Sequence, residues 1–186
     1  VYLANFLLFF CVTAATWAQR LDFIKNYSNI NLRVEGITET KAGGYLLVGG
    51  VQDINGGDYV IIDVDSSGNI VWTNHGDRFD GFNWKSTIVS AVDYDNNFYL
   101  SGACTPLHGG VSQIYIVKCD SSGNKLWDKT IPTTGIAIGN KIDFSKSGGL
   151  ICSAYISDTS LGSGLHPGLI KMDTSGNVLW NVAPSF

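Results

Sequence analysis

One eight-residue phrase occurs three times in this chain, and it limits the possible folds more than any other feature. Each copy begins with Asp, carries Ser-Gly-Asn at its centre and ends in Trp, at residues 65–72, 120–127 and 173–180. The three tryptophans are 55 and 53 residues apart. A chain that repeats itself at such a period usually folds into stacked units, because one unit cannot bury its apolar face alone. We therefore expect a repeat architecture.

Four short apolar segments of strand length make up each copy. Turns rich in Gly, Asn and Asp separate the first two segments and the last two, and these residues tolerate positive φ or bond to the neighbouring backbone. Two hairpins in series predict a four-stranded antiparallel sheet. The expected strands are residues 32–39, 45–51, 58–64 and 69–74 in the first copy, 87–92, 98–104, 113–119 and 125–129 in the second, and 140–145, 150–156, 168–173 and 177–182 in the third.

Tandem four-stranded units of this length are typical of β-propeller blades. We expect an all-β, partial β-propeller with blades at about residues 23–74, 75–129 and 130–182. Because propeller rings usually have about four to eight blades, three blades would leave both terminal sheet faces bare. We interpret residues 19–186 as part of a longer chain, with further blades as partners, or as a chain that closes its ring by association.

Three residues of each phrase are assigned structural roles. The Asp should accept hydrogen bonds from the turn backbone, and the Gly should supply the positive φ. The Trp should lie between its own blade and the next, where burial of an indole stabilises the fold by up to ~4–6 kcal/mol. A series of sugar-stacking tryptophans is the alternative. The residues are Asp65, Gly68, Trp72, Asp120, Gly123, Trp127, Asp173, Gly176 and Trp180.

Residues 1–18 form an apolar segment that ends in Thr16-Trp17-Ala18. It is shorter than the ~20 residues of a membrane-spanning helix, and its small-residue end favours cleavage after Ala18. We predict a signal peptide, truncated at its start because the sequence has no initial Met and no basic residue before Arg20. A membrane anchor is the alternative. The mature protein is expected to be secreted or at the cell surface, and free of the membrane.

Charge excludes partners that are bound by basic patches. The formal net charge is −4 and the sequence contains no Lys/Arg cluster. Nucleic acids and anionic membranes are bound by basic patches, so neither is an expected partner.

Three cysteines remain after the apolar segment, and an odd number cannot pair completely. Cys104, Cys119 and Cys152 each stand where the other copies have an aliphatic residue. We expect buried small hydrophobic side chains rather than redox or zinc sites.

The segments at residues 43–49, 58–62 and 65–72 resemble the tandem repeats of secreted bacterial β-propeller proteins, many of them surface proteins exported by type IX secretion. The resemblance covers residues 23–180 and implies export and surface display. The phrase is also distantly similar to the tryptophan-docking repeat of quinoprotein propellers. It departs from that repeat because only two residues separate its Asp from its Gly, and because the units are longer.

Metal binding is weakly indicated. Asp63 and Asp65 imitate the start of a calcium loop, but Lys118 and Lys171 replace Asp63 in the other copies, and no bidentate Glu follows. We therefore predict no cofactor and no metal site. Loose calcium binding by Asp93 and Asp95 is the alternative.

A ligand site is expected on the face of the propeller that carries the longer connections. The connection at residues 75–86 combines carboxylates and a guanidinium with aromatic rings, which are groups that bind carbohydrate or peptide. An ordered loop with Arg78 paired to Asp80 and Trp84 packed inward is the alternative. The candidate ligand-binding residues are Asp77, Arg78, Asp80, Phe82, Trp84 and His108.

The sequence favours a non-catalytic, exported module that binds extracellular protein or glycan, and it contains no nucleophile elbow, zinc-protease motif or phosphate loop. We predict no catalytic residues. Two other hypotheses stay open: a fragment of a propeller-type enzyme, either a glycosidase or a quinone-dependent dehydrogenase, and a structural spacer. The enzyme would need acids or a cofactor site that converge on the central axis.

Overall fold

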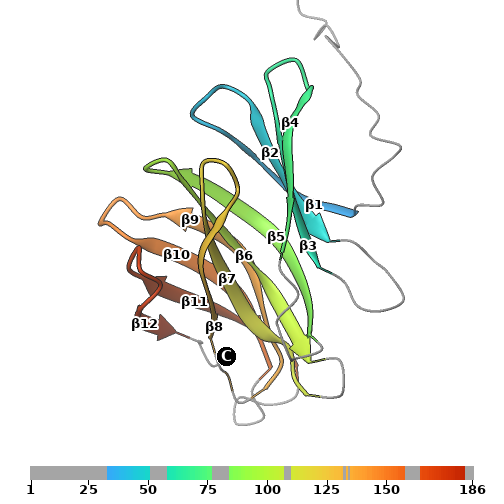
Figure 1. The fold of residues 1–186 in the computed structure, drawn as a ribbon. Coiled ribbons are helices and arrows are strands. Elements are labelled where there is room, and N and C mark those ends of the chain that lie inside the picture. The colour runs from blue at the N-terminus through green and yellow to red at the C-terminus, as the bar shows by residue number, and fades with distance from the viewer. Residues whose placement is uncertain are drawn as a thin grey trace, which may run out of the picture.

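The computed structural model describes residues 33–50, 58–76, 84–106, 110–131, 133, 135–157 and 164–182, with the backbone alone at 84–87 and 106. The expected signal peptide at residues 1–18 lies outside these ranges. Within them all regular structure is β (Figure 1). The strands are β1 (Arg33–Glu39), β2 (Tyr45–Gly50), β3 (Tyr59–Val64), β4 (Ile70–His75), β5 (Trp84–Tyr94), β6 (Asn97–Pro106), β7 (Gln113–Asp120), β8 (Lys125–Ile131), β9 (Ala137–Phe144), β10 (Leu150–Ile156), β11 (His166–Met172) and β12 (Val178–Val182).

These strands form three four-stranded antiparallel sheets, each with its strands in chain order. The first sheet is β1–β4, the second β5–β8 and the third β9–β12. The prediction of three such sheets, one for each copy of the repeat, is confirmed. The described sheets fan out side by side and do not close into a ring (Figure 1).

The hairpin of the second sheet is longer than the sequence predicts. Strands were expected at residues 87–92 and 98–104, whereas β5 and β6 pair up to Tyr94 and Asn97. Asp95 and Asn96 form a two-residue turn with φ of 51° and 56°. Positive φ at both central residues matches the right-handed twist of the strands, so the strands can pair up to the turn itself.

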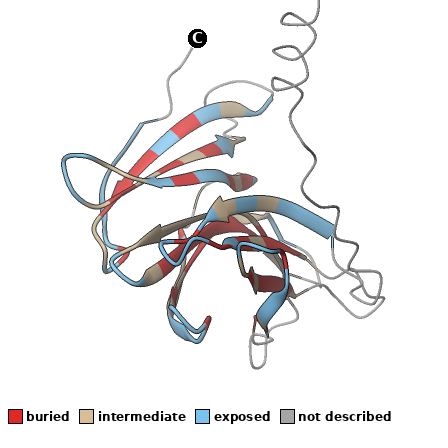
Figure 2. Cartoon of the chain, turned by 90° about the horizontal axis from the view of Figure 1, so that it is seen from above, coloured by how far each residue is buried: buried red, intermediate tan, exposed pale blue. Residues whose placement is uncertain are grey.

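Successive sheets pack through their first strands. β5 contacts β1, β2 and β3 of the first sheet, and β9 contacts β5, β6 and β7 of the second. We call the face of a sheet that is turned toward the next sheet in sequence its leading face, and the opposite face its trailing face. The buried residues collect where a leading face meets a trailing face (Figure 2).

Two of the three hydrophobic clusters lie between sheets. The first cluster joins Leu46 and Ile61 of the first sheet to Leu100 and Val117 of the second. The second cluster joins the second sheet to the third in the same way, for example through Ile116 and Ile170. Burial of apolar surface stabilises a fold by about 25 cal/mol per Å². A single sheet on its own would lack the part of this stabilisation that the contacts between sheets provide.

Each first strand contains a β-bulge at the same position of the repeat. The extra residues are Glu35 in β1, Val89 in β5 and Asn140 in β9. A bulge bends its strand and increases the local twist. The three bulges therefore give the first strands a common shape where they meet.

Candidate functional site

The turn of each phrase is a closed hydrogen-bonded unit. In the second copy, Asp120 Oδ1 accepts bonds from Ser122 N and Asn124 N, both at 2.9 Å, and Oδ2 accepts one from Asn124 Nδ2 at 3.0 Å. Gly123 has a φ of +79°. The bonds from the side chain and backbone of Asn124 lower the pKa of the Asp120 carboxyl. The predicted turn roles of Asp and Gly are confirmed.

The same bonds form in the first and third copies, around Asp65 and Asp173. Gly68 and Gly176 have φ values of +76° and +77°. The turn thus has one geometry in all three copies, whatever lies beside it.

Each of the first two tryptophans contacts the turn glycine of the next sheet. A Cβ atom on Gly123 would lie 2.5 Å from Cζ3 of Trp72, and one on Gly176 would lie 2.8 Å from Cη2 of Trp127. Only a glycine permits so close an approach. The prediction that Trp72 and Trp127 lie between their own sheet and the next is confirmed.

The residue two positions after each of these two tryptophans also reaches the next turn. Asn74 Nδ2 donates to the Gly123 carbonyl at 2.7 Å, and Lys129 Nζ donates to Asn177 Oδ1 at 3.1 Å. Strand β4 is thereby fixed to the second sheet, and β8 to the third.

Trp180 has no such partner in the described part of the chain and is 46% exposed. The same contrast holds four residues before each turn Asp, where Ile61 and Ile116 are 1% and 0% exposed but Leu169 is 47% exposed. We call the exposed set the third leading face. Its residues are Tyr155, Pro167, Leu169, Trp180 and Val182.

Not every exposed apolar residue of the third sheet belongs to this contrast. Leu179 is the extra residue of the β-bulge in β12 and is 60% exposed. Its counterparts Val71 and Leu126 are exposed as well, although their sheets have neighbours. The exposure of Leu179 is therefore a general property of the repeat, whereas the exposure of Leu169 is particular to the third sheet.

A groove of about 430 Å³ crosses the third leading face, and its lining is mainly apolar. On the second sheet β9 fills the corresponding place, since a Cβ on Gly139 would lie 2.5 Å from Ser101 Oγ and 3.1 Å from Ile114 Cγ2. The groove is lined by Asn140, Ser153, Ala154, Tyr155, Pro167, Gly168, Leu169 and Val182.

The terminal faces were expected to be bare at both ends of the stack, and this is wrong for the first sheet. Val60, Ile62 and Val64 on its trailing face are buried, with Leu47 packed against them. The expectation holds for the third leading face. The sequence argument treated both ends alike, but the two ends have different surroundings.

A second groove, of about 280 Å³, lies where β1, β5 and β9 meet beside the three bulges. Thr38, Ser90 and Asn140 contribute polar groups to it, and Lys141 and Asp143 are the charged residues of its lining. It occupies the place where an axis would run if the sheets were arranged as blades around a ring.

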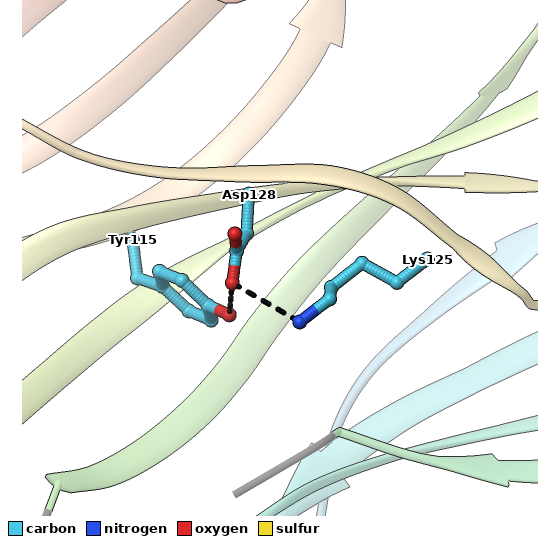
Figure 3. Close-up of polar contacts among 3 residues, drawn as sticks. All are labelled: Tyr115, Lys125 and Asp128. Carbon is cyan, nitrogen blue, oxygen red and sulfur yellow. Dashed lines mark hydrogen bonds and ion pairs between the residues drawn. The ribbon is translucent and has the colours of Figure 1, made fainter. Parts of the chain in front are cut away.

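One polar network stands between the first and second sheets (Figure 3). The hydroxyl of buried Tyr115 donates to Asp128 Oδ2 at 2.7 Å, and Lys125 Nζ lies 3.5 Å from the same oxygen. Burial and this hydrogen bond raise the pKa of Tyr115. The network satisfies the polar end of an aromatic core residue, so its evident role is packing.

Cys104, Cys119 and Cys152 are buried, as expected, and none of them forms a disulfide among the described residues. Burial raises the pKa of Cys104 and of Cys119 to about 12, which keeps both thiols protonated at neutral pH. Cys152 Sγ lies 3.1 Å from Ser101 Oγ and thus joins the second sheet to the third.

The residues weighed for calcium have other contacts. Asp93 Oδ2 accepts a bond from Lys41 N at 2.8 Å, while its buried Oδ1 has no partner among the described residues. Burial, and then the nearby Asp93 charge, raise the pKa of Asp63. Lys171, at the position of Asp63, donates to the carbonyl of Gly148 in its own sheet. In the described ranges no three His, Cys, Asp or Glu side chains converge as metal ligands would.

The predicted loop site lies largely outside the described residues. Asp77, Arg78, Asp80, Phe82 and His108 are not described, and Trp84 begins β5 with only its backbone described. The loop site therefore stays a prediction. Of the third leading face, only Trp180 was among the predicted residues, with a structural role and with sugar stacking as the alternative. The matching positions of Ile61, Ile116 and Leu169 were nevertheless visible in the sequence.

No family model matches the chain, and no curated protein matches it. Within the described part, none of the structure is a helix long and apolar enough to span a membrane.

Proposed function

We propose that this chain is a non-catalytic module of a secreted or cell-surface β-propeller, and that it functions by binding protein. The observation that carries the proposal is the third leading face, where apolar side chains are exposed at positions that are buried or half-buried on the other two sheets. Contiguous apolar surface of this kind marks protein interaction sites. Export is supported by the apolar segment at residues 1–18 and by the resemblance to secreted repeat proteins.

The free energy that burial of the third leading face would contribute favours a protein partner over a small ligand. Full burial of one large apolar side chain contributes about 1.5–3 kcal/mol. Leu169, Trp180 and Val182 are each about half exposed. Covering them together requires a broad, flat partner, and a sheet or a helix pair has that shape.

The propeller arrangement is supported by the regular stacking. The same strands, the same Trp-to-Gly contact and the same bulge position recur at both sheet interfaces. Repeats that are joined in one way at every step continue in one direction of curvature, which is the principle of a propeller.

A photo-crosslinking experiment in the source organism tests the function. Benzoylphenylalanine replaces Tyr155 on the third leading face, Leu179 on the outer edge, or Phe82 in the predicted loop site. We expect protein adducts from position 155 and not from position 179, because both are exposed but only the first belongs to the leading face. Adducts from position 82 alone would mean that the protein binds through the predicted loop site and not through the third leading face. No protein adduct at 155 or 82 would reject a protein-binding role.

A further inference from the structure

We propose that the third leading face is a dimer interface and packs against the same face of a second copy of the chain. This inference rests on the proposed function, because it names the protein that the face binds. In the proposed dimer a two-fold axis lies between the two sheets and crosses their strands at the level of Ile142 in β9 and Ile170 in β11. Each strand of the third sheet then lies antiparallel to the same strand of the second copy.

Strand β9 carries charges where the first strands of the other two sheets have none. The comparison concerns two positions on the leading side of each first strand, one directly after the bulge and one two residues later. Of the described sheets, only the third has charged side chains at these positions. The residues are Gly36, Ser90 and Lys141 at the first position, and Thr38, Val92 and Asp143 at the second.

Lys141 and Asp143 are available to contact another molecule. Both are exposed, while Ile142 between them is buried in the second cluster. Because side chains alternate along a strand, Lys141 and Asp143 point to the leading side of β9, beside the third leading face. In the described part of the chain Lys141 takes part in no ion pair, and Asp143 accepts a bond only from N of the adjacent Phe144, at 2.7 Å.

A partner packed as the sheets pack on one another would not suit these charges. Between the first two sheets, a Cβ on Gly36 would lie 2.5 Å from the Val89 carbonyl, so the following strand comes close at this position. Between the second and third sheets, Ser90 Oγ accepts a bond from Ile142 N at 3.3 Å. A strand packed in this way over Lys141 would take its ammonium out of water, which is unfavourable unless it meets an opposite charge. The surface therefore favours an occupant that brings opposite charges.

The strand register makes the charge pattern self-complementary. Across the leading side of the third sheet the side chains form two rows, one on each side of the proposed axis. The axis places each row over the other row of the second copy. Lys141 then faces Asp143 of the second copy, and Trp180 faces Val182. The rows are Lys141, Ser153, Leu169 and Val182, and Asp143, Ile151, Lys171 and Trp180.

The remaining side chains of the two rows bring no unpaired charge. Lys171 is buried, and its ammonium donates to the Gly148 carbonyl in its own sheet. Leu169, Trp180 and Val182 are about half exposed, so the dimer would remove their apolar surface from water. An axis that runs along β9 is disfavoured, because it would place like charges over each other.

Head-to-tail pairing of copies fits less well. It would need the trailing face of the first sheet, where Val60, Ile62 and Val64 are already buried. The same-face dimer uncovers none of these side chains. It is also closed, because both copies use the same surface for the contact. It therefore differs from a ring that is completed by association.

Sedimentation velocity of the purified chain, over a wide range of concentrations, tests the dimer. We expect a monomer–dimer equilibrium with no larger species. Lys141→Asp and Asp143→Lys each create a like-charge contact twice in every dimer, and each should raise the dissociation constant at least tenfold. The double variant Lys141→Asp, Asp143→Lys exchanges the two charges and should restore the dissociation constant. Lys146→Asp is the matched control, since Lys146 is exposed in the turn after β9 and lies outside both rows.

A further variant does not depend on the charge pair. Trp180→Glu places a carboxylate opposite an apolar side chain and should also abolish the dimer, and urea unfolding checks that the chain still folds. A chain that stays monomeric at every concentration would overturn the inference. So would a dimer that is insensitive to Trp180→Glu or to the charge reversals, or one that the double variant does not restore.

The proposed function fails through a different result. If position 155 crosslinks to another protein and the chain is monomeric, the protein-binding role stands and the dimer is rejected. Adducts between two copies at position 155, together with a dimer in sedimentation, support both proposals. The function itself is rejected only if positions 155 and 82 both give no protein adduct.

Discussion

The indoles of Trp127 and Trp180 occupy the same position of the repeat in different surroundings. Trp127 lies against Gly176 and packs on the core between the second and third sheets. Trp180 follows an identical turn but is 46% exposed. The residue and its position in the strand are the same in both places. The main difference is the contact with a following sheet, and Lys129, which lies over the Trp127 ring, is replaced by Val182 beside Trp180.

The geometry of the turns, unlike the exposure of the leading faces, does not depend on the neighbouring sheet. Asp120 and Asp173 accept the same set of bonds at nearly the same distances, although within the described residues a further sheet follows only Asp120. Local bonds thus form the hairpins, and contacts between sheets form the core. This division is expected for repeat proteins, whose stability is approximately a sum of unit and interface contributions.

Replacing the two tryptophans tests this comparison with the largest expected effect. Trp127→Ala removes an indole from the core and should lower the free energy of unfolding by about 3–5 kcal/mol. Trp180→Ala removes a half-exposed ring and should cost less than about 1.5 kcal/mol. Urea unfolding of both variants measures the difference. Equal losses would mean that Trp180 is already covered in solution.

Substitution of the turn glycines isolates the contact between sheets. Gly123→Val combines left-handed strain of about 1–2 kcal/mol with about 1–3 kcal/mol of overpacking against Trp72. Gly148→Val is the matched control, since Gly148 has a φ of +85° and nothing within 4 Å of a Cβ. It should cost the strain alone. If both variants unfold at the same urea concentration, the Trp-to-Gly contact contributes nothing.

The sequence predicts the hairpins well because their determinants are local. The turn at residues 65–69 is specified by an Asp that bonds to the next backbone groups and by a Gly that permits positive φ. The strands follow from apolar segments on either side. Even the position of Trp72 between two sheets could be inferred, because its period matches the repeat.

The contacts of a side chain with a neighbouring sheet could not be predicted in the same way. Leu169 and Ile116 look alike in sequence, and only the stacking of sheets makes one exposed and the other buried. The bond from Tyr115 to Asp128 is equally hidden, because Val60 and Gly168 stand at the position of Tyr115 in the other copies. Features that occur once in a repeat leave no periodic signal.

The Tyr115 network gives a smaller test of how the two interfaces differ. Gly168 replaces Tyr115 in the third sheet, so only the interface between the first and second sheets contains this bond. Tyr115→Phe removes one donor to a carboxylate and should cost about 1–3 kcal/mol. The same substitution in an Asp128→Asn background should cost less, because the charged acceptor is gone. Equal costs in both backgrounds, measured by urea unfolding, would show that the charge of the acceptor does not contribute.

The loss of stability at acid pH tests whether the turns are independent of the neighbouring sheets. It has the smallest expected effect of the four tests. Hydrogen bonds from Asn124 and Asn177 hold the pKa of Asp120 and of Asp173 below the ordinary value of 3.8. A carboxyl whose pKa is lowered on folding contributes stability above its unfolded pKa, and the contribution is lost as the pH falls through the folded pKa. The wild type should therefore lose stability below about pH 4, and Asp120→Asn should lose less over the same interval. Both carboxylates are exposed, so the change will be small.

Asp173→Asn completes this comparison, since its turn belongs to the sheet with the bare leading face. If the turn bonds are local, Asp120→Asn and Asp173→Asn should flatten the acid limb to the same extent, in thermal unfolding measured from about pH 5 to about pH 2.5. Lys129 adds a weak favourable charge near Asp173, and high salt removes it. A difference between the two variants that persists in high salt would mean that the turn senses its neighbouring sheet, and the separation of local and interface contributions would fail.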